Sequence, residues 1–79
     1  MSWLTQVPLR MDAADARYGP FASTHEALGV ASEEWDEFRE AIHSNDLAKV
    51  EKEALDLAAC LLRLVEQIGD DSLRGRSVK

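Results

Sequence analysis

Two long segments with a helical spacing of apolar residues follow one another in this chain, with only Ser44-Asn45-Asp46 between them. The first runs from about residue 23 to residue 43, and the second from about residue 47 to residue 68. Apolar residues three and four positions apart place a stripe along each predicted helix. Because so short a turn leaves two long helices only one way to bury these stripes together, the sequence predicts an antiparallel helical hairpin.

A shorter helix is predicted ahead of the hairpin, over about residues 6 to 18. Pro8 is expected in its first turn, where a missing N–H costs little, and Gly19-Pro20 ends the helix. The three apolar stripes comprise Leu4, Val7, Met11, Ala14 and Tyr18 in the first helix, Leu28, Ala31, Trp35, Phe38 and Ile42 in the second, and Leu47, Val50, Ala54, Leu57, Leu61, Val65 and Ile68 in the third.

Capping residues support the same division of the chain. Ser23 is the expected N-cap of the second helix, with Glu26 reaching back in a capping box, and Gly69 suits the end of the third helix. The predicted fold class is therefore all-α, a three-helix chain that forms a single domain over residues 1–79. A polar tail is expected from about residue 70 to residue 79.

Size limits the stability that the core can supply. A chain of 79 residues builds a marginal core unless a disulfide, a metal or a partner chain adds stability. Cys60 is the single cysteine, so no intrachain disulfide can form, and its apolar run LAACLLR favours a small buried hydrophobe over a catalytic thiol. The apolar arcs of the hairpin are wider than one short helix can cover. We therefore expect a homodimer or a higher homo-oligomer that completes a helical bundle.

Charge and hydropathy narrow the classes of partner. The net charge of −6, from 15 acidic and 9 basic residues, is a poor match for nucleic-acid phosphates, so direct nucleic-acid binding is not expected. No stretch is apolar for long enough to span a membrane, and the N-terminal MSWLTQVPLRMDA lacks the apolar core of a signal peptide. Together with the lone cysteine, these features favour a cytoplasmic protein.

Four acidic residues lie on or beside the apolar face of the hairpin. On a helical wheel, Glu34 falls among the apolar residues of the second helix and Glu37 at their border. Glu53 falls among the apolar residues of the third helix and Asp56 at their border. In an antiparallel pair that turns near Asn45, facing residues have numbers that sum to about 90, as Glu37 and Glu53 do. Since Glu34 and Asp56 give the same sum, four carboxylates are expected to meet on one flank.

Such a cluster needs compensation. Bare carboxylates at short range repel one another and lose solvation, so the cluster requires protons or a bound cation. Oxygen ligands suit a hard divalent ion such as Mg²⁺, and the chain has no His or Cys set with zinc spacing. Either acidic pair alone is common on the wet face of a soluble helix. Their matched wheel positions and facing register favour a metal site over chance.

The acidic spacing resembles that of a known family. Glu34-x-x-Glu37, then fifteen residues, then Glu53-x-x-Asp56 is similar to the pattern of the MazG-like nucleoside triphosphate pyrophosphohydrolases. The stretch that carries the resemblance is HEALGVASEEWDEFREAIHSNDLAKVEKEALDLAACLLRLVE, about half of the chain, in which Lys49 fits the family's lysine four residues before the second acidic pair. The resemblance implies an all-α fold related to the dimeric dUTPases, and Mg²⁺ or Mn²⁺ held by all four acids. It also implies hydrolysis between the α- and β-phosphates to a nucleoside monophosphate and pyrophosphate, in the clearance of non-canonical nucleotides.

Three further residues are candidates for contact with a nucleotide. Lys49 would bind phosphate as a point charge, or would pair with Glu53 as an ordinary surface lysine. Arg63 would reach phosphate, or would be a solvated arginine at the edge of the core. His25 would contact the substrate, or would be a surface histidine near the helix cap.

The expected activity is that of a metal-dependent pyrophosphohydrolase acting on a nucleoside triphosphate. Its catalytic set comprises Glu34, Glu37 and Lys49, with either glutamate orienting the attacking water. The alternative is a non-catalytic metal-binding helical dimer that retains the fold, an interpretation suggested by the small size of the chain. A plain structural bundle with wet acidic faces is the third hypothesis.

Overall fold

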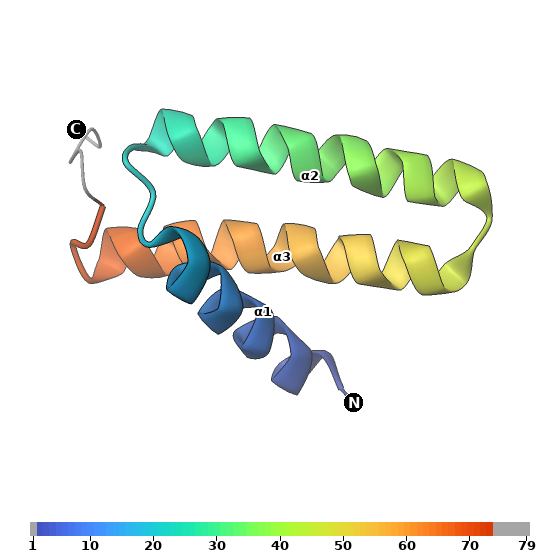
Figure 1. The fold of residues 1–79 in the computed structure, drawn as a ribbon, viewed down its shortest axis with the longest axis horizontal. Helices are drawn as coiled ribbons and strands as arrows, with labels where there is room; N and C mark the ends of the chain where they lie inside the picture. The colour runs from blue at the N-terminus through green and yellow to red at the C-terminus, as the bar shows by residue number, and fades with distance from the viewer. Residues whose placement is uncertain (1, 74–79) are drawn as a thin grey trace.

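The computed structural model describes residues 2–73, and within this range the chain forms three helices and no strand. They are α1 (Trp3–Tyr18), α2 (Thr24–Ser44) and α3 (Leu47–Gly69), which confirms the all-α, three-helix prediction. Helices α2 and α3 lie side by side along their length, and α1 packs across α3 (Figure 1). None of the described helices combines the length and the hydropathy needed to cross a bilayer.

The caps of α2 and α3 follow from local sequence chemistry. The Ser23 hydroxyl accepts a hydrogen bond from the Glu26 N–H at 3.0 Å, as the capping box predicts. The Glu26 carboxylate reaches back one residue further than expected and accepts from the Ala22 N–H at 2.8 Å. Asp46 caps α3 by accepting from the Ala48 N–H at 3.0 Å, and Asn45 makes the joint in a left-handed conformation with φ of 58°. Since Ser44 is still helical, the connection is tighter than the sequence predicts.

Helix α1 begins one turn earlier than predicted. The Ser2 carbonyl accepts hydrogen bonds from the N–H groups of Thr5 and Gln6, both at 3.1 Å, and so closes an additional first turn. The expectation that Pro8 occupies the first turn is therefore wrong: it lies in the second turn, inside the helix. The early start brings Val7 into contact with α3, where it is buried, and this tertiary contact offsets the backbone hydrogen bond that Pro8 cannot donate.

The end of α3 uses an aspartate where a glycine is usual. Gly69 is the last helical residue, but Asp71 adopts the left-handed conformation, with φ of 58°. The Ser72 N–H then donates to the Gln67 carbonyl at 3.0 Å, as in a Schellman motif. This turn carries Leu73 into the core, although the sequence predicts a polar tail there. The rest of that tail, residues 74–79, lies outside the described residues.

The core is small and sits where the ends of all three helices converge. It consists of Phe21, Ala27, Cys60 and Leu73, with Val30, Ala31 and Leu64 packed against it. Cys60 is buried, as predicted, and its burial raises the pKa of the thiol and makes it a weak nucleophile. No large side chain is fully buried within residues 2–73. One chain therefore leaves much of its apolar surface open to solvent.

Buried polar groups fix α1 and its connection to α2. Arg63 is only 4% exposed, and its guanidinium donates to Asp15 Oδ1 and to the Gly19 carbonyl, both at 2.8 Å, and lies over the Phe21 ring. The Gln67 side chain accepts from the Phe21 N–H at 2.8 Å. Two polar side chains of α3 thereby hold the end of α1 and the segment that follows it.

Much of the predicted apolar stripe lies on the surface. Leu28, Trp35 and Ile42 of α2 are exposed, as are Leu61, Val65 and Ile68 of α3. Only small or polar residues are buried on these two helices: Ala27, Ala41, Ala59, Cys60, Arg63 and Gln67. The reason is that α1 covers the side of α3 that carries the anchoring polar residues, so that the opposite side of the pair has no cover within the described chain.

Candidate metal centre

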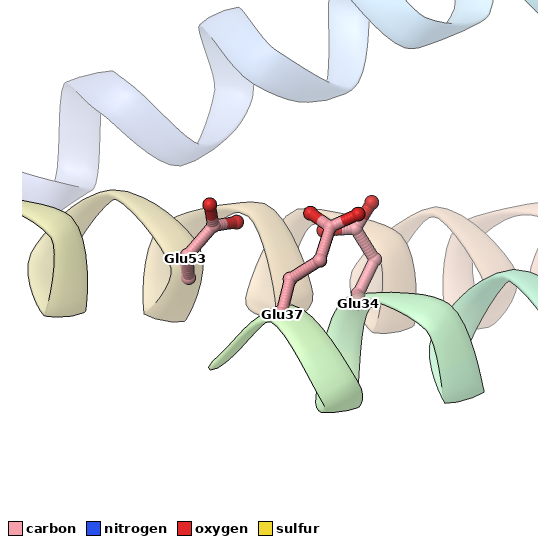
Figure 2. Close-up of side chains that lie close together, drawn as sticks. All are labelled: Glu34, Glu37 and Glu53. Atoms are coloured by element: carbon pink, nitrogen blue, oxygen red, sulfur yellow. The ribbon is translucent and has the colours of Figure 1, made fainter. Parts of the chain in front are cut away.

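Three glutamates from two helices converge beside α1. Glu34 and Glu37 lie one turn apart on α2, and Glu53 projects from the neighbouring part of α3 (Figure 2). One carboxylate oxygen from each residue lies within 4.8 Å of one from each of the others. The fold therefore brings together three of the four acids that the sequence singles out, through spacing on one helix and side-by-side packing with the next.

In two of these carboxylates, one buried oxygen has no hydrogen-bond partner among the described residues. Glu34 Oε2 and Glu53 Oε1 are buried and have no hydrogen-bond partner within residues 2–73. The Glu53 side chain is only 18% exposed, whereas Glu37 is open to solvent. Leaving a buried carboxylate oxygen unpaired is costly, because desolvation is not repaid by a protein contact. An all-oxygen donor set with unsatisfied atoms fits a hard divalent cation.

The electrostatics of the cluster point in the same direction. Burial, followed by the charges of Glu37, Asp56 and Glu53, raises the pKa of Glu34 above its ordinary value of 4.5. Loss of hydration, followed by the charge of Glu53 and a hydrogen bond shared with it, raises the pKa of Glu37. Positive charge, as a proton or as a cation, is therefore favoured at this position.

Asp56 differs from the other three acids because basic side chains already neutralise it. Asp56 Oδ1 accepts from Arg10 Nε at 2.9 Å, and Oδ2 accepts from Lys52 Nζ at 3.0 Å. Lys52 Nζ also lies 3.6 Å from Glu53 Oε2. Asp56 neighbours the cluster but has a partner on each oxygen, so it is not as free to bind an ion as the predicted four-ligand set requires.

A groove flanks the carboxylates near the turn between α2 and α3. This turn-end groove has a volume of about 420 Å³, and its polar lining comprises Glu37, Glu40, Ser44, Lys49, Lys52 and Glu53. Lys49 is exposed there and forms no ion pair within the described residues; the pairing of Lys49 with Glu53 is replaced by that of Lys52. The groove thus sets two lysines beside two of the clustered glutamates.

A smaller cavity of about 130 Å³ lies toward the other end of the cluster, with Glu34, Asp56, Tyr18 and Arg63 among its lining residues. The interpretation of Arg63 as a solvated arginine is wrong, because its buried guanidinium is engaged by Asp15 and Gly19. His25 is exposed in the first turn of α2, nine residues before Glu34 and so about 14 Å away along the helix. The structure does not bring His25 to the carboxylates.

The candidate residues predicted from the sequence do not include two basic residues of the site, Lys52 and Arg10. Lys52 lies four positions before Asp56, the spacing of an intrahelical ion pair, so that the sequence contains a signal for it. Arg10 comes from α1 and has no comparable signal, since its contact with Asp56 depends on how α1 crosses α3.

Comparison with known proteins finds no match to this chain among family models, curated proteins or solved structures. The features of the chain that bear on its function are the geometry of the three glutamates and the spacing of the acidic pairs.

Proposed function

We propose that Glu34, Glu37 and Glu53 hold a divalent cation of the Mg²⁺ or Mn²⁺ type, and that the chain hydrolyses a nucleoside triphosphate to a nucleoside monophosphate and pyrophosphate. The observation that carries the metal site is the pair of buried, unpartnered oxygens on Glu34 and Glu53, next to a third carboxylate. Support for the nucleotide comes from the acidic spacing, which resembles that of the MazG-like pyrophosphohydrolases, and from the lysines of the turn-end groove.

The side chains that line the turn-end groove have different roles in the proposed reaction. Lys49 and Lys52 offer positive charge to a phosphate chain lying along the turn-end groove. When bound, the cation would neutralise carboxylate and phosphate charge and help to align the scissile anhydride. Glu37 is exposed and lines this groove, whereas Glu34 faces the smaller cavity, so Glu37 is the better placed of the two to orient a water for in-line attack. Glu37 would take the proton of that water as the bond to the leaving pyrophosphate breaks.

The experiment combines cation binding with product release. Purified protein is titrated with Mn²⁺ by calorimetry, and pyrophosphate is measured after incubation with a panel of NTPs and dNTPs in Mg²⁺. We expect binding of Mn²⁺, release of pyrophosphate from at least one nucleotide, and loss of both in Glu53→Gln. The matched control is Glu51→Gln, an exposed glutamate on the same helix outside the cluster. Failure to bind Mn²⁺ would overturn the metal site, and binding without pyrophosphate would overturn the hydrolase.

We further propose that the chain works as a homodimer or higher homo-oligomer. An outer apolar groove of about 680 Å³ lies between α2 and α3, lined by Leu28, Ala31, Trp35, Leu57 and Leu61 together with Asp36 and Arg39. A second copy is its expected occupant, because the small core of one chain leaves these large side chains exposed and an apolar face of this kind is self-complementary across a two-fold axis.

Sedimentation analysis at micromolar concentration tests whether the chain self-associates, and a stable monomer would overturn the proposed homo-oligomer. Pyrophosphate release separates the two functions considered for the fold, because both are assigned to a dimer. A protein that dimerises and binds Mn²⁺ but releases no pyrophosphate from any nucleotide is the non-catalytic metal-binding helical dimer.

A further inference from the structure

Lys52 occupies an unusual position next to the three glutamates. Its Nζ lies 3.0 Å from Asp56 Oδ2 and 3.6 Å from Glu53 Oε2, so that one ammonium group bridges a glutamate of the cluster and the neighbouring Asp56. The side chain is nevertheless 61% exposed, and it also lines the turn-end groove. Within the described residues, Lys52 is the only lysine paired with these acids.

We propose that Lys52 is the built-in counter-cation of the metal-free site, and that it leaves Asp56 and Glu53 for the turn-end groove when a divalent cation is bound. This inference rests on the metal site proposed above. Its ammonium lies too close to Glu53 to keep its position beside a second cation on the same carboxylate, because like charges at such a separation repel strongly where solvent is partly excluded.

Lys52, rather than Arg10, is the group that moves. Arg10 is more deeply placed, at 29% exposure, and its guanidinium is held by Gln6 Oε1 at 3.0 Å as well as by Asp56. Lys52 has a flexible four-carbon stem and an exposed side chain, so its ammonium can move by rotation about side-chain bonds alone. The move frees Asp56 Oδ2, while Asp56 Oδ1 keeps its hydrogen bond from Arg10 Nε.

The new position of Lys52 in the turn-end groove affects the binding of a phosphate group. In the turn-end groove Lys52 joins Lys49, so cation binding adds a second free positive charge where an anionic phosphate group would lie. Lys52 thereby couples the two ligands: the protein becomes a better receptor for a phosphate group after the cation has arrived. Such coupling is reciprocal by thermodynamic linkage.

Trace labelling of amines tests the movement directly. The full chain is treated briefly with acetic anhydride, with and without saturating Mg²⁺, and acetylation of Lys52 is measured by mass spectrometry relative to Lys49 in the same molecules. We expect the ratio to rise about two- to fivefold with Mg²⁺, as the ion pairs of an exposed lysine are released. Mn²⁺ binding measured by calorimetry on the same sample, with an unchanged or lower ratio, would overturn this inference alone. Absence of Mn²⁺ binding would overturn both it and the proposed metal site.

Affinity measurements supply the second readout. Lys52→Gln should bind Mn²⁺ about two- to fivefold more tightly than the wild-type protein, because no resident cation has to be displaced. Lys49→Gln removes the same charge from the same groove but no ion pair, so its affinity should change less. Equal gains in the two variants would indicate a general charge effect and would overturn the displacement of Lys52.

Discussion

The two faces of the α2–α3 pair are built in opposite ways. The face beside α1 carries Glu34, Glu37 and Glu53, and two of its carboxylate oxygens are buried without a hydrogen-bond partner among the described residues. The outer face carries Trp35 and Leu61, which are about half exposed, and no residue of α1 lines its groove. On the face beside α1, buried carboxylate oxygens thus lack hydrogen-bond partners among the described residues. On the outer face, large apolar side chains are exposed to water. An isolated chain would be more stable with its polar atoms exposed and its apolar atoms covered, and for this reason we propose a cation on one face and a second copy on the other.

The largest effect that separates the faces is expected from Glu34→Leu. Removing one of the three proposed ligands should weaken Mn²⁺ binding at least about 100-fold, more than the loss of a residue that only supports a ligand. In metal-free buffer the same variant should be more stable by about 1 kcal/mol, because a buried carboxylate oxygen without a partner is replaced by an apolar group. Calorimetry and urea unfolding in EDTA measure the two quantities.

The control for this variant is Glu33→Leu, which changes the adjacent, exposed residue in the same way. Its Mn²⁺ affinity should match that of the wild-type protein. If Glu34→Leu bound Mn²⁺ as tightly as the control, the face beside α1 would be an ordinary acidic surface, as in the plain-bundle hypothesis.

The second effect concerns the outer face. Trp35→Glu places a charge in the outer apolar groove and should weaken self-association about 30-fold or more, the cost of losing an aromatic anchor of an interface. Sedimentation velocity measures the dimer fraction across a concentration series. The matched control is Trp3→Glu, because Trp3 is also exposed but lies outside that groove. Equal dissociation in both variants would show that the outer groove is not the interface.

The helices and caps that form the two faces were predictable from the sequence, whereas the elements that pack against each face were not. Helix spacing and the caps at Ser23 and Asp46 depend on neighbours in the chain, so the helices are found close to their predicted limits. Wheel positions also anticipate that Glu37 and Glu53 come together, since both angles follow from residue number. A wheel identifies the apolar side of a helix but not the element that packs on it.

Several of the errors follow from the docking of α1. Arg10 meets Asp56 across 46 residues of sequence, and Asp15 meets Arg63 across 48. Such contacts carry no periodic signal, so the sequence predicts Arg63 as a phosphate contact or a solvated arginine, and Asp56 as a metal ligand. The same docking extends α1 by a turn and moves Pro8 into the helix interior. Tertiary packing therefore decided which of the predicted site residues are available.

The third effect tests how the face beside α1 is covered. Arg63→Met removes the ion pair with Asp15, the hydrogen bond to the Gly19 carbonyl and the stacking on Phe21. The free energy of unfolding should fall by about 1 to 2 kcal/mol, less than for a fully buried pair because Asp15 is 42% exposed and regains water. Urea denaturation measures the loss. Arg17→Met, an exposed arginine of α1, should change stability by less than about 0.5 kcal/mol; similar losses in both variants would contradict an anchoring role for Arg63.

The smallest effect is expected from pH, and its sign distinguishes protons from a metal ion as the partner of the face beside α1. Burial and neighbouring carboxylates raise the folded-state pKa of Glu34 and Glu37 above the unfolded value of 4.5. Between the two values the folded state binds more protons than the unfolded state, so this contribution to stability is complete below the unfolded pKa and is lost as pH rises through the folded pKa. In EDTA, the free energy of unfolding should therefore decline from about pH 4.5 toward neutrality. Saturating Mg²⁺ should oppose the decline, since a cation takes over the role of the protons and its binding releases them.

Urea unfolding across this range measures both slopes, with the double variant Glu34→Gln and Glu37→Gln as the control that should remove the decline. A metal-free stability that stays level or rises over the range would mean that solvent already screens these carboxylates, and the contrast between the two faces would then reduce to the apolar groove alone.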